Sequence, residues 1–292
     1  MRFFRGVLVA LAAGVMLCLA AGYLGWLHPA GDSFAVFRAQ GAMALALVAG
    51  LGFLAQARRM AAVLLVVAAL AGGPVLLAYQ IEGEAGALVL YQKNMLFRNS
   101  DLAGLEADIR AMAPEVLTLQ EVSKANLALL ASVSDLLPHQ MFCPFAAVGG
   151  TAVATRLTPV PGSEICAKGL AAMQVEGPQG RLWLVSIHLH WPWPYRQAAQ
   201  LETLVPLIAG LDGPMVIAGD FNMVRWSTAL GGVRTAGRVR NAGPARGTYP
   251  QFGPLLVLPI DHVLAPGGGS IELRPLLGSD HRGLVGRLGL SP

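Results

Sequence analysis

MVIAGDFN, at Met215–Asn222, joins an apolar run to two polar side chains that can carry chemistry. A short, continuous apolar run bounded by glycine is typical of a strand that is buried in a sheet. Asp220 and Asn222 stand where this run ends. The stretch therefore predicts a buried strand that delivers a carboxylate and an amide to one edge of a sheet.

Similar apolar runs recur after residue 81 and alternate with stretches that have helical periodicity. The other predicted strands are Ala87–Gln92, Glu115–Gln120, Thr151–Thr155, Leu182–Ile187 and Leu255–Ile260. The predicted helices are Asp101–Ala113, Lys124–Asp135 and Tyr195–Leu211. Residues 228–248 are rich in Gly and Arg, and we expect a mobile, solvated loop near the site there. This alternation predicts an α/β fold.

Several predicted strands end at polar residues that can bind a metal or move a proton. These residues are Asn94, Glu121, His188, Asp220, Asn222 and Asp261, and the pair Asp280 and His281 precedes the last strand. A single carboxylate at a strand end often only caps the next helix or turn. The joint appearance of so many, each following an apolar strand, indicates a functional site.

The order and the local sequences of these segments resemble those of the endonuclease/exonuclease/phosphatase superfamily. The matching segments are YQKNMLFRN (Tyr91–Asn99), PEVLTLQEV (Pro114–Val122), GGTAVATR (Gly149–Arg156), LVSIHL (Leu184–Leu189), MVIAGDFN (Met215–Asn222), PIDHVL (Pro259–Leu264) and GSDHRGLV (Gly278–Val285). LQEV, GDFN and SDH in this order are a strong signal, whereas each alone is weak. The resemblance implies a four-layer α/β sandwich of two packed mixed β-sheets flanked by helices, with a metal site at one rim.

The resemblance also implies which residues hold a metal ion. Glu121 matches the principal ligand of Mg²⁺ or Mn²⁺, and Asp280 matches a second carboxylate near that ion. Asn94 matches an asparagine that supports the metal or the phosphate from the neighbouring strand. Carboxylate oxygens suit a hard cation whose other positions are filled mostly by water.

The remaining matches concern catalysis. Asp220 and Asn222 match the pair that positions the attacking water and contacts the scissile phosphate. His281 matches the catalytic histidine, Asp261 the carboxylate that orients it, and His188 a histidine close to the leaving oxygen. An aspartate beside a histidine raises the imidazole pKa, which suits a group that is cationic near neutral pH.

These residue types predict hydrolysis of a phosphodiester or a phosphomonoester by direct attack of water. A divalent cation and one or two imidazolium groups would neutralise the charge that develops on the phosphoryl oxygens. Two alternatives stay open, namely a nuclease specific for DNA or RNA and a catalytically inactive, membrane-anchored binding module. The presence of Glu121, Asp220 and His281 argues against the inactive module.

Residues 1–80 are predicted to be a membrane anchor. A helix needs about 20 mostly apolar residues to cross a bilayer, and runs at about 7–27, 34–57 and 60–79 meet this requirement. A cleaved signal peptide is the alternative for the first run. The predicted catalytic domain then covers residues 81–292.

Arginines give the predicted orientation of these spans. Arg2 and Arg5 precede the first span and Arg58 and Arg59 separate the second from the third, whereas His28–Ser33 contains no Lys or Arg. The positive-inside rule then puts the N-terminus in the cytoplasm and the catalytic domain outside. We expect an integral protein of a bacterial inner or plasma membrane with a periplasmic or otherwise extracytoplasmic catalytic domain.

The charge distribution does not favour nucleic acid as the substrate. The chain has 21 Lys and Arg and 17 Asp and Glu; residues 1–80 hold five and one of these, which leaves 16 of each in residues 81–292. A neutral domain is poorly suited to a long polyanion that is held by many phosphate contacts. The expected partners are therefore a phosphoester substrate and the lipid bilayer.

Some residues have no assigned role. They are His190, His262, Trp191 and Trp193. Either histidine belongs to the site or lies beside it, and the tryptophans stack on substrate, sit at the membrane interface or pack in a loop. Cys143 and Cys166 form one disulfide or stay as separate thiols.

Overall fold

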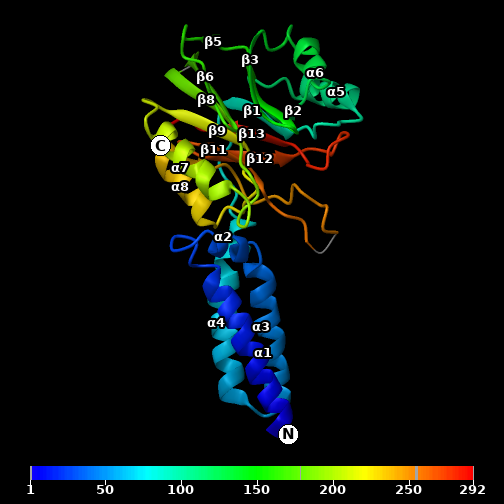
Figure 1. Ribbon diagram of the computed structural model, residues 1–292, viewed down its shortest axis with the longest axis vertical. Helices are drawn as coiled ribbons and strands as arrows, with labels where there is room; N and C mark the ends of the chain where they lie inside the picture. The colour runs from blue at the N-terminus through cyan, green and yellow to red at the C-terminus, as the bar shows by residue number, and fades with distance from the viewer. Residues whose placement is uncertain (1, 178, 254–255, 292) are drawn as a thin grey trace.

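Two β-sheets and a bundle of apolar helices make up the chain. The computed structural model describes residues 2–177, 179–253 and 256–291. Two mixed sheets pack face to face with helices on their outer surfaces, and the helical bundle extends away from one side of this sandwich (Figure 1). The predicted α/β sandwich is therefore confirmed.

The first sheet has the strand order β12-β13-β1-β2-β4-β3. Its strands are β1 (Leu88–Asn94), β2 (Val116–Val122), β3 (His139–Ala146), β4 (Gly149–Thr155), β12 (Gly269–Leu273) and β13 (Leu284–Leu288). β1 and β2 are parallel, and β13 and β4 pair with them antiparallel on either side. Asn94 pairs with Gln120 in the register, so Asn94 and Glu121 reach the same edge of the sheet.

The second sheet has the order β10-β11-β9-β8-β7-β5, and β6 pairs with β7 beside this path. Its strands are β5 (Thr158–Pro159), β6 (Ile165–Ala167), β7 (Leu170–Gly177), β8 (Gly180–His188), β9 (Met215–Asp220), β10 (Arg240–Asn241) and β11 (Asp261–Ala265). β8 and β9 are parallel, with His188 opposite Asp220. Asp261, the first residue of the antiparallel β11, also lies opposite Asp220.

The central strands are apolar on both faces because both faces are covered. Leu90 and Val116 of the first sheet pack with Leu184 and Val216 of the second in one buried cluster. Helices cover the outer faces of the sheets, and their apolar residues complete two further clusters. The covering helices are α5 (Leu102–Met112), α6 (Leu127–Ser132), α7 (Gln197–Ala209) and α8 (Thr228–Gly237).

Two predictions about local structure are wrong. Residues 228–248 are not a mobile loop, because Thr228–Gly237 form α8, with Ser227 as its cap through a 3.1 Å bond from Leu230 N. The apolar run Leu255–Ile260 contains no strand in its described part, and β11 begins only at Asp261; Leu255 itself lies outside the described residues. Pro259 explains the late start, because proline has no N–H to donate to a sheet.

The N-terminal bundle consists of α1 (Arg2–Ala21), the short α2 (Ala30–Ala35), α3 (Arg38–Leu54) and α4 (Arg58–Ala78). α3 packs against both α1 and α4, and Leu8, Leu45 and Leu64 are buried between them. The outward faces are apolar as well, so Leu17, Leu47 and Leu70 are each more than two-thirds exposed. Such a bundle has no polar face for water.

Two of these helices are long and apolar enough to cross a membrane, namely Phe3–Ala21 in α1 and the whole of α4. The prediction of three such helices is therefore wrong for the second one, at residues 34–57. This segment leaves the helical conformation at Phe37, where φ is −98° and ψ is 14°. Only the 17 residues of α3 follow as continuous helix.

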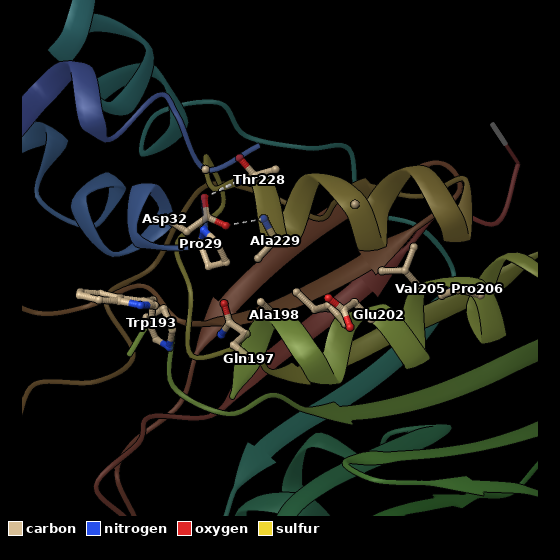
Figure 2. Close-up of a pocket in the computed structure, with 14 residues that line it drawn as sticks. Pro29, Asp32, Trp193, Gln197, Ala198, Glu202, Val205, Pro206, Thr228 and Ala229 are labelled. Atoms are coloured by element: carbon tan, nitrogen blue, oxygen red, sulfur yellow. Dashed lines mark hydrogen bonds between the residues drawn. The ribbon is translucent and has the colours of Figure 1, made fainter. Parts of the chain in front are cut away.

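The bundle is fixed to the second sheet's helices by hydrogen bonds. Asp32 of α2 is buried, and its carboxylate accepts the first N–H groups of α8, from Thr228 and Ala229, both at 2.8 Å (Figure 2). A carboxylate at a helix N-terminus also opposes the positive end of the helix dipole. At the end of α4, the carbonyl of Ala78 accepts from the Ala245 N–H at 2.7 Å. Both α2 and the end of α4 therefore lie against the sandwich.

A disulfide joins the two sheets. Cys143 of β3 and Cys166 of β6 are bonded, with their Cα atoms 5.4 Å apart. β3 lies at the edge of the first sheet and β6 beside β7 of the second. Of the two alternatives left open by the sequence, the structure has the bridge.

Candidate active site

The two parallel strand pairs deliver their last side chains to one cavity. The cavity has a volume of about 200 Å³, and its polar lining comes from Glu121, His188, His190, Asp220, Asn222, Asp280 and His281. Asn94 and Asp261 lie directly behind this lining, bonded to Asp220 and His281. The structure thus brings together all eight side chains that the sequence singled out for the site.

Glu121 enters the cavity through an irregularity in β2. The register with β4 shifts between Leu119 and Val122, and Glu121 has a φ of +55°. This left-handed conformation is uncommon for residues other than glycine. The carboxylate accepts from Phe97 N at 3.0 Å and from the Asn94 amide at 3.3 Å. Burial, together with the charge of Asp280, holds the pKa of Glu121 above its usual value.

Asp220 is the most deeply buried acid that lines the cavity, at 1% exposure. It accepts from the Asn222 N–H at 2.8 Å and from the Asn94 amide, which crosses from the other sheet, at 3.0 Å. Burial raises the pKa of Asp220 to about 7, although the charge of His281 and these hydrogen bonds act in the opposite direction. A carboxylate with such a pKa can take up and release a proton near neutral pH.

His281 and Asp261 form a buried pair. The Nδ1 atom of His281 lies 2.8 Å from Asp261 Oδ2, and its Nε2 atom is 3.7 Å from Asp220 Oδ2. Burial alone would lower the pKa of His281, but the charges of Asp261 and Asp220 raise it to about 9. The same pairing keeps the pKa of Asp261 below its usual value despite burial. The imidazole is therefore cationic at neutral pH.

A buried polar network behind the pair connects the two sheets. Gln92 donates to Asp261 Oδ1 and to Gln120 Oε1, both at 2.9 Å. Gln120 in turn donates to the Ser186 hydroxyl at 3.0 Å. These glutamines and Ser186 were not among the predicted site residues. A glutamine inside an apolar strand, one or two residues before a site residue, is nevertheless a usable signal, because buried polar groups need partners.

Lys93 fixes the segment that carries His281. This lysine is fully buried, and its three ammonium hydrogens have three acceptors, the carbonyls of Pro275, Leu276 and His281 at 3.0, 2.6 and 2.6 Å. Burial lowers the pKa of Lys93 to about 8. Lys93 was not among the predicted site residues either, because nothing in its local sequence reveals three acceptors more than 180 residues away.

The other histidines differ in their positions. His188 lines the cavity, but its Nε2 lies 3.6 Å from Asp220 Oδ2, which is too long for a hydrogen bond. Burial and the nearby charge of His281 lower the pKa of His188 to about 3, so it is neutral, and of the one or two expected imidazolium groups the site has one, His281. His190 lines the cavity, whereas His262 turns away and bonds the Met223 carbonyl at 2.7 Å.

Asn222 lines the cavity and has one buried side-chain acceptor without a donor among the described residues. Its amide nitrogen donates to the Leu189 carbonyl at 2.8 Å, and φ is +47° at this residue. Among the described residues, no donor faces its side-chain oxygen. The choice between amide oxygen and nitrogen follows from these bonds. An acceptor suits a water molecule better than an anionic phosphate oxygen.

Two sets of side chains are candidates for holding a cation. In the first, ligand atoms of Asp220, Asp261 and His281 lie within 4.8 Å of one another. However, both oxygens of Asp261 already accept bonds, from Gln92 and His281. In the second, Glu121 lies beside Asp280, whose buried Oδ1 has no donor within the described part of the chain. The second set fits Mg²⁺ or Mn²⁺ better, because Glu121 and Asp280 are only half-buried and both line the cavity, which Asp261 does not. Carboxylate oxygens are the ligands that such hard cations prefer.

Aromatic rings line the opening of the cavity. The Tyr249 ring centre is 4.7 Å from that of His281 and 5.7 Å from that of Trp191, and the Phe145 ring is 5.6 Å from that of His188. The sequence left the role of Trp191 open, and it did not indicate a role for Tyr249 or Phe145. An aromatic residue in a loop has no fixed partner until the fold is known.

Solved structures share this fold. The endonuclease/exonuclease/phosphatase family protein from Leptotrichia buccalis C-1013-b matches with a TM-score of 0.54 and 12% identity, over 70% of this chain and 100% of that chain. A beta toxin variant from Staphylococcus aureus, solved with bound magnesium ions, also gives 0.54 and 12%, over 70% and 100%. Truncated TDP2 from Caenorhabditis elegans gives 0.52 and 16%, over 68% and 96%. At these identities the likeness concerns the fold alone.

The comparison of sequences is more specific. No curated protein matches the chain. The sequence model of the endonuclease/exonuclease/phosphatase family matches residues 91–281, which is more than half of the chain and includes all eight predicted site residues, with His281 at its end. The chain therefore belongs to the endonuclease/exonuclease/phosphatase family.

Proposed function

We propose that the chain is a membrane-tethered, divalent-metal-dependent phosphoesterase that hydrolyses a phosphodiester or phosphomonoester by direct attack of water. One observation carries this proposal. A cationic imidazole, held at 2.8 Å by Asp261, faces the buried Asp220, and Glu121 and Asp280 open onto the same cavity. This combination offers a proton acceptor, a cation for developing charge and oxygen ligands for a metal ion.

Asp220 receives a proton from the attacking water. Its pKa of about 7 lets it act as a base near neutral pH. The unpaired oxygen of Asn222 accepts from the same water and orients it. The water oxygen forms a new bond to phosphorus, one ester P–O bond breaks, and no enzyme atom becomes bonded to the substrate.

His281 serves the leaving oxygen. Its imidazolium, kept cationic by Asp261, stabilises the developing negative charge and donates a proton to the alkoxide that leaves. Asp220 gains one proton and His281 loses one, so exchange with solvent restores both. His188, neutral at this pH, is a hydrogen-bond donor beside them.

Glu121 and Asp280 are the proposed metal ligands. A Mg²⁺ or Mn²⁺ ion there would neutralise charge on the phosphoryl oxygens. Asn94 donates to both Glu121 and Asp220, at 3.3 and 3.0 Å, and so sets the two carboxylates at a fixed spacing.

Residues 1–80 are proposed as the membrane anchor of a catalytic domain at 81–292. The apolar outer faces of α1, α3 and α4 support a lipid environment, because large leucines there are exposed. α1 packs against α3 as part of the bundle, which favours a retained helix over a cleaved signal peptide.

The proposed orientation puts the catalytic domain outside the cytoplasm of a bacterial cell. Arg5 bonds the carbonyl of Ala55, so the N-terminus lies at the same end of the bundle as Arg58 and Arg59. α2 and the end of α4 lie at the other end, against the sandwich. The disulfide between Cys143 and Cys166 suits an oxidising compartment.

A hydrolysis assay tests the enzymatic part. The full chain in detergent micelles is given bis-p-nitrophenyl phosphate and p-nitrophenyl phosphate, with Mg²⁺, with Mn²⁺ or with a chelator. We expect metal-dependent release of nitrophenol from at least one of them, and far slower release with Asp220→Asn or His281→Gln. A folded wild-type protein that hydrolyses no phosphoester would favour the binding module instead.

A fusion tests the topology. A reporter that is active only outside the cytoplasm is placed after residue 85, and the same reporter is placed after Gln56, between α3 and α4. We expect activity from the first fusion and none from the second. The reverse pattern would overturn the orientation while leaving the proposed chemistry intact.

A further inference from the structure

One short loop connects the catalytic cavity to the anchor. His190 and Trp191 line the cavity, and Trp193, two residues later, accepts a hydrogen bond at its carbonyl from the Ser33 hydroxyl at 2.7 Å. The Trp193 ring centre is also 6.2 Å from that of His28. Trp193, Pro29 of the anchor and Gln197 of α7 line a second cavity, at the junction between the anchor and the sandwich (Figure 2). The cavity that holds the catalytic side chains is thus only two residues along the chain from the bundle.

A second loop makes the same connection. Tyr249 lies over His281, and Phe252 packs against Tyr249 with ring centres 5.8 Å apart. The same segment is bonded to the end of α4 through Ala245. In Figure 1 the loops that follow β8 and precede β11, drawn in yellow-green and orange, descend from the sandwich toward the bundle. The active-site edge of the sandwich therefore faces the anchor.

Exposed aromatic side chains gather on these two loops. From β1 onward, the large apolar side chains that are exposed in the described residues are Trp191, Trp193, Tyr195, Phe252 and Leu276. All except Leu276 belong to the two loops, and we call these four the aromatic rim. An apolar patch beside an active site marks an interaction surface. Tryptophan and tyrosine are the residues favoured where a bilayer meets water.

We propose that the aromatic rim lies in the bilayer interface and that the substrate is a phosphate ester of a membrane lipid. The acyl part stays in the bilayer while the head-group phosphate enters the cavity between Trp191 and Tyr249. This inference rests on the proposed function, since it names the substrate class of the same site and takes the bundle as a membrane anchor.

Size and charge agree with a lipid head group. A cavity of about 200 Å³ accommodates a phosphate with a small substituent. The sequence from residue 81 onward has as many acidic as basic residues, so it offers no excess charge for a long polyanion. The larger cavity at the junction, of about 430 Å³, suits a phosphate less well. Its lining among the described residues includes Asp32 and Glu202 but no histidine, lysine or arginine, whereas the catalytic cavity is lined by the cationic His281.

The test compares the rate of hydrolysis of one head group on a lipid in a bilayer with the rate on a soluble short-chain analogue. The full chain in phosphatidylcholine nanodiscs receives dioleoyl phosphatidic acid or dioleoyl phosphatidylglycerol in the disc, or the dibutyryl analogue of each in solution. We expect at least one long-chain lipid to be hydrolysed about tenfold faster than its soluble analogue. In the Trp193→Ser/Tyr195→Ser double variant we expect the ratio of these two rates to fall by about tenfold, because large apolar groups have been removed from the interface.

Two further variants complete the design. Phe252→Ser, on the other loop, should lower the same preference, so the inference does not depend on the folding of one variant. Arg181→Ser is the matched control, because Arg181 is an exposed residue near the opposite end of the strand that ends in His188, so its ratio should equal that of the wild type.

The outcomes separate the two proposals. Equal rates for long-chain and soluble substrates, unchanged ratios in both rim variants, or faster cleavage of a DNA oligonucleotide would overturn the lipid inference and leave a phosphoesterase. Inactivity of the folded wild type on every phosphoester, soluble ones included, would overturn the proposed function and the inference with it.

Discussion

The two halves of the sandwich supply the site through the same architecture but with different side chains. In the first sheet, the parallel pair β1 and β2 ends in Asn94 and Glu121. In the second, the parallel pair β8 and β9 ends in His188 and Asp220. A covering helix, α5 or α7, lies between the two strands of each pair along the chain. Each half therefore contributes one carboxylate, next to a nitrogen-bearing side chain.

The two carboxylates differ in what surrounds them. Glu121 stands on a bulge with positive φ and remains half-buried, and its neighbour Asp280 has an oxygen without a donor among the described residues. Asp220 lies in a regular strand, is buried, and accepts two bonds of 3.0 Å or less. Accessibility suits Glu121 to a hydrated cation, whereas burial suits Asp220 to proton exchange. The backbone irregularity, rather than the residue type, makes the difference.

The largest expected effect comes from Asp220→Asn. The amide keeps the shape and the acceptor for the Asn222 N–H, but it cannot take a proton. We expect kcat to fall about 10³-fold, within the range for loss of a general base. The measurement is kcat over a wide range of Mg²⁺ concentration. Recovery of the rate at high Mg²⁺ would mean that Asp220 acts as a metal ligand, and the comparison between the carboxylates would fail.

The disulfide tests whether the two halves depend on one another. Cys143→Ser removes the bridge between β3 and β6, which closes a loop with a sequence separation of 23 residues. A loop of this size predicts a loss of about 3 kcal/mol in the free energy of unfolding. Denaturant unfolding of the full chain in detergent, followed by the fluorescence of its tryptophans, measures it. Cys18→Ser is the control, since Cys18 is a free cysteine; equal midpoints for both variants would contradict the prediction.

A smaller effect is expected for Glu121→Gln. The single side-chain oxygen of glutamine can keep the bond from the Phe97 N–H, but the variant loses the second acceptor, which receives from Asn94, and the negative charge that would attract the cation. We expect the Mg²⁺ concentration for half-maximal activity to rise about 10–100-fold, with the rate recovering in excess Mg²⁺. Calorimetric titration with Mg²⁺ provides a second readout that is independent of turnover. A lower rate with unchanged Mg²⁺ dependence would place the cation elsewhere.

The sequence predicted which side chains gather at the cavity better than it predicted the residues that surround them. Each of the eight predicted side chains follows or precedes a buried strand, so local pattern and strand order were enough to gather them. The buried partners Gln92, Gln120 and Lys93 were missed because their contacts lie far away along the chain. Such contacts exist only once the two sheets have packed.

Errors in the predicted fold have equally local causes. The glycines of α8 lower its helix propensity, so the sequence predicts a loop there. In the structure, the carboxylate of Asp32 in the distant α2 accepts hydrogen bonds from the first turn of the helix and stabilises it. The second predicted span was too long because apolar composition does not reveal the break at Phe37. Tertiary contacts decided the first case, and backbone geometry the second.

The smallest expected effect is a shift in the pH dependence of activity. It distinguishes Asp261, the carboxylate bonded to His281, from Asp220, the carboxylate proposed to exchange protons. His281 has its pKa raised to about 9, with the charge of Asp261 the largest favourable cause, so the cationic form persists up to that pH and activity should fall above it. The acid limb should lie near pH 7, where Asp220 must lose its proton to act as a base, and both limbs belong to a coupled group of residues.

Removal of the Asp261 charge must lower the pKa of His281, because burial alone acts in that direction. In Asp261→Asn we therefore expect the alkaline limb of the residual kcat/KM profile to move to lower pH by about one unit or more. Asp135→Asn, which removes an exposed carboxylate paired with Arg110, is the control and should leave the profile unchanged. An alkaline limb that stays near pH 9 in Asp261→Asn would show that a group other than His281 carries the essential proton, and the buried half of the site would need a different base and acid.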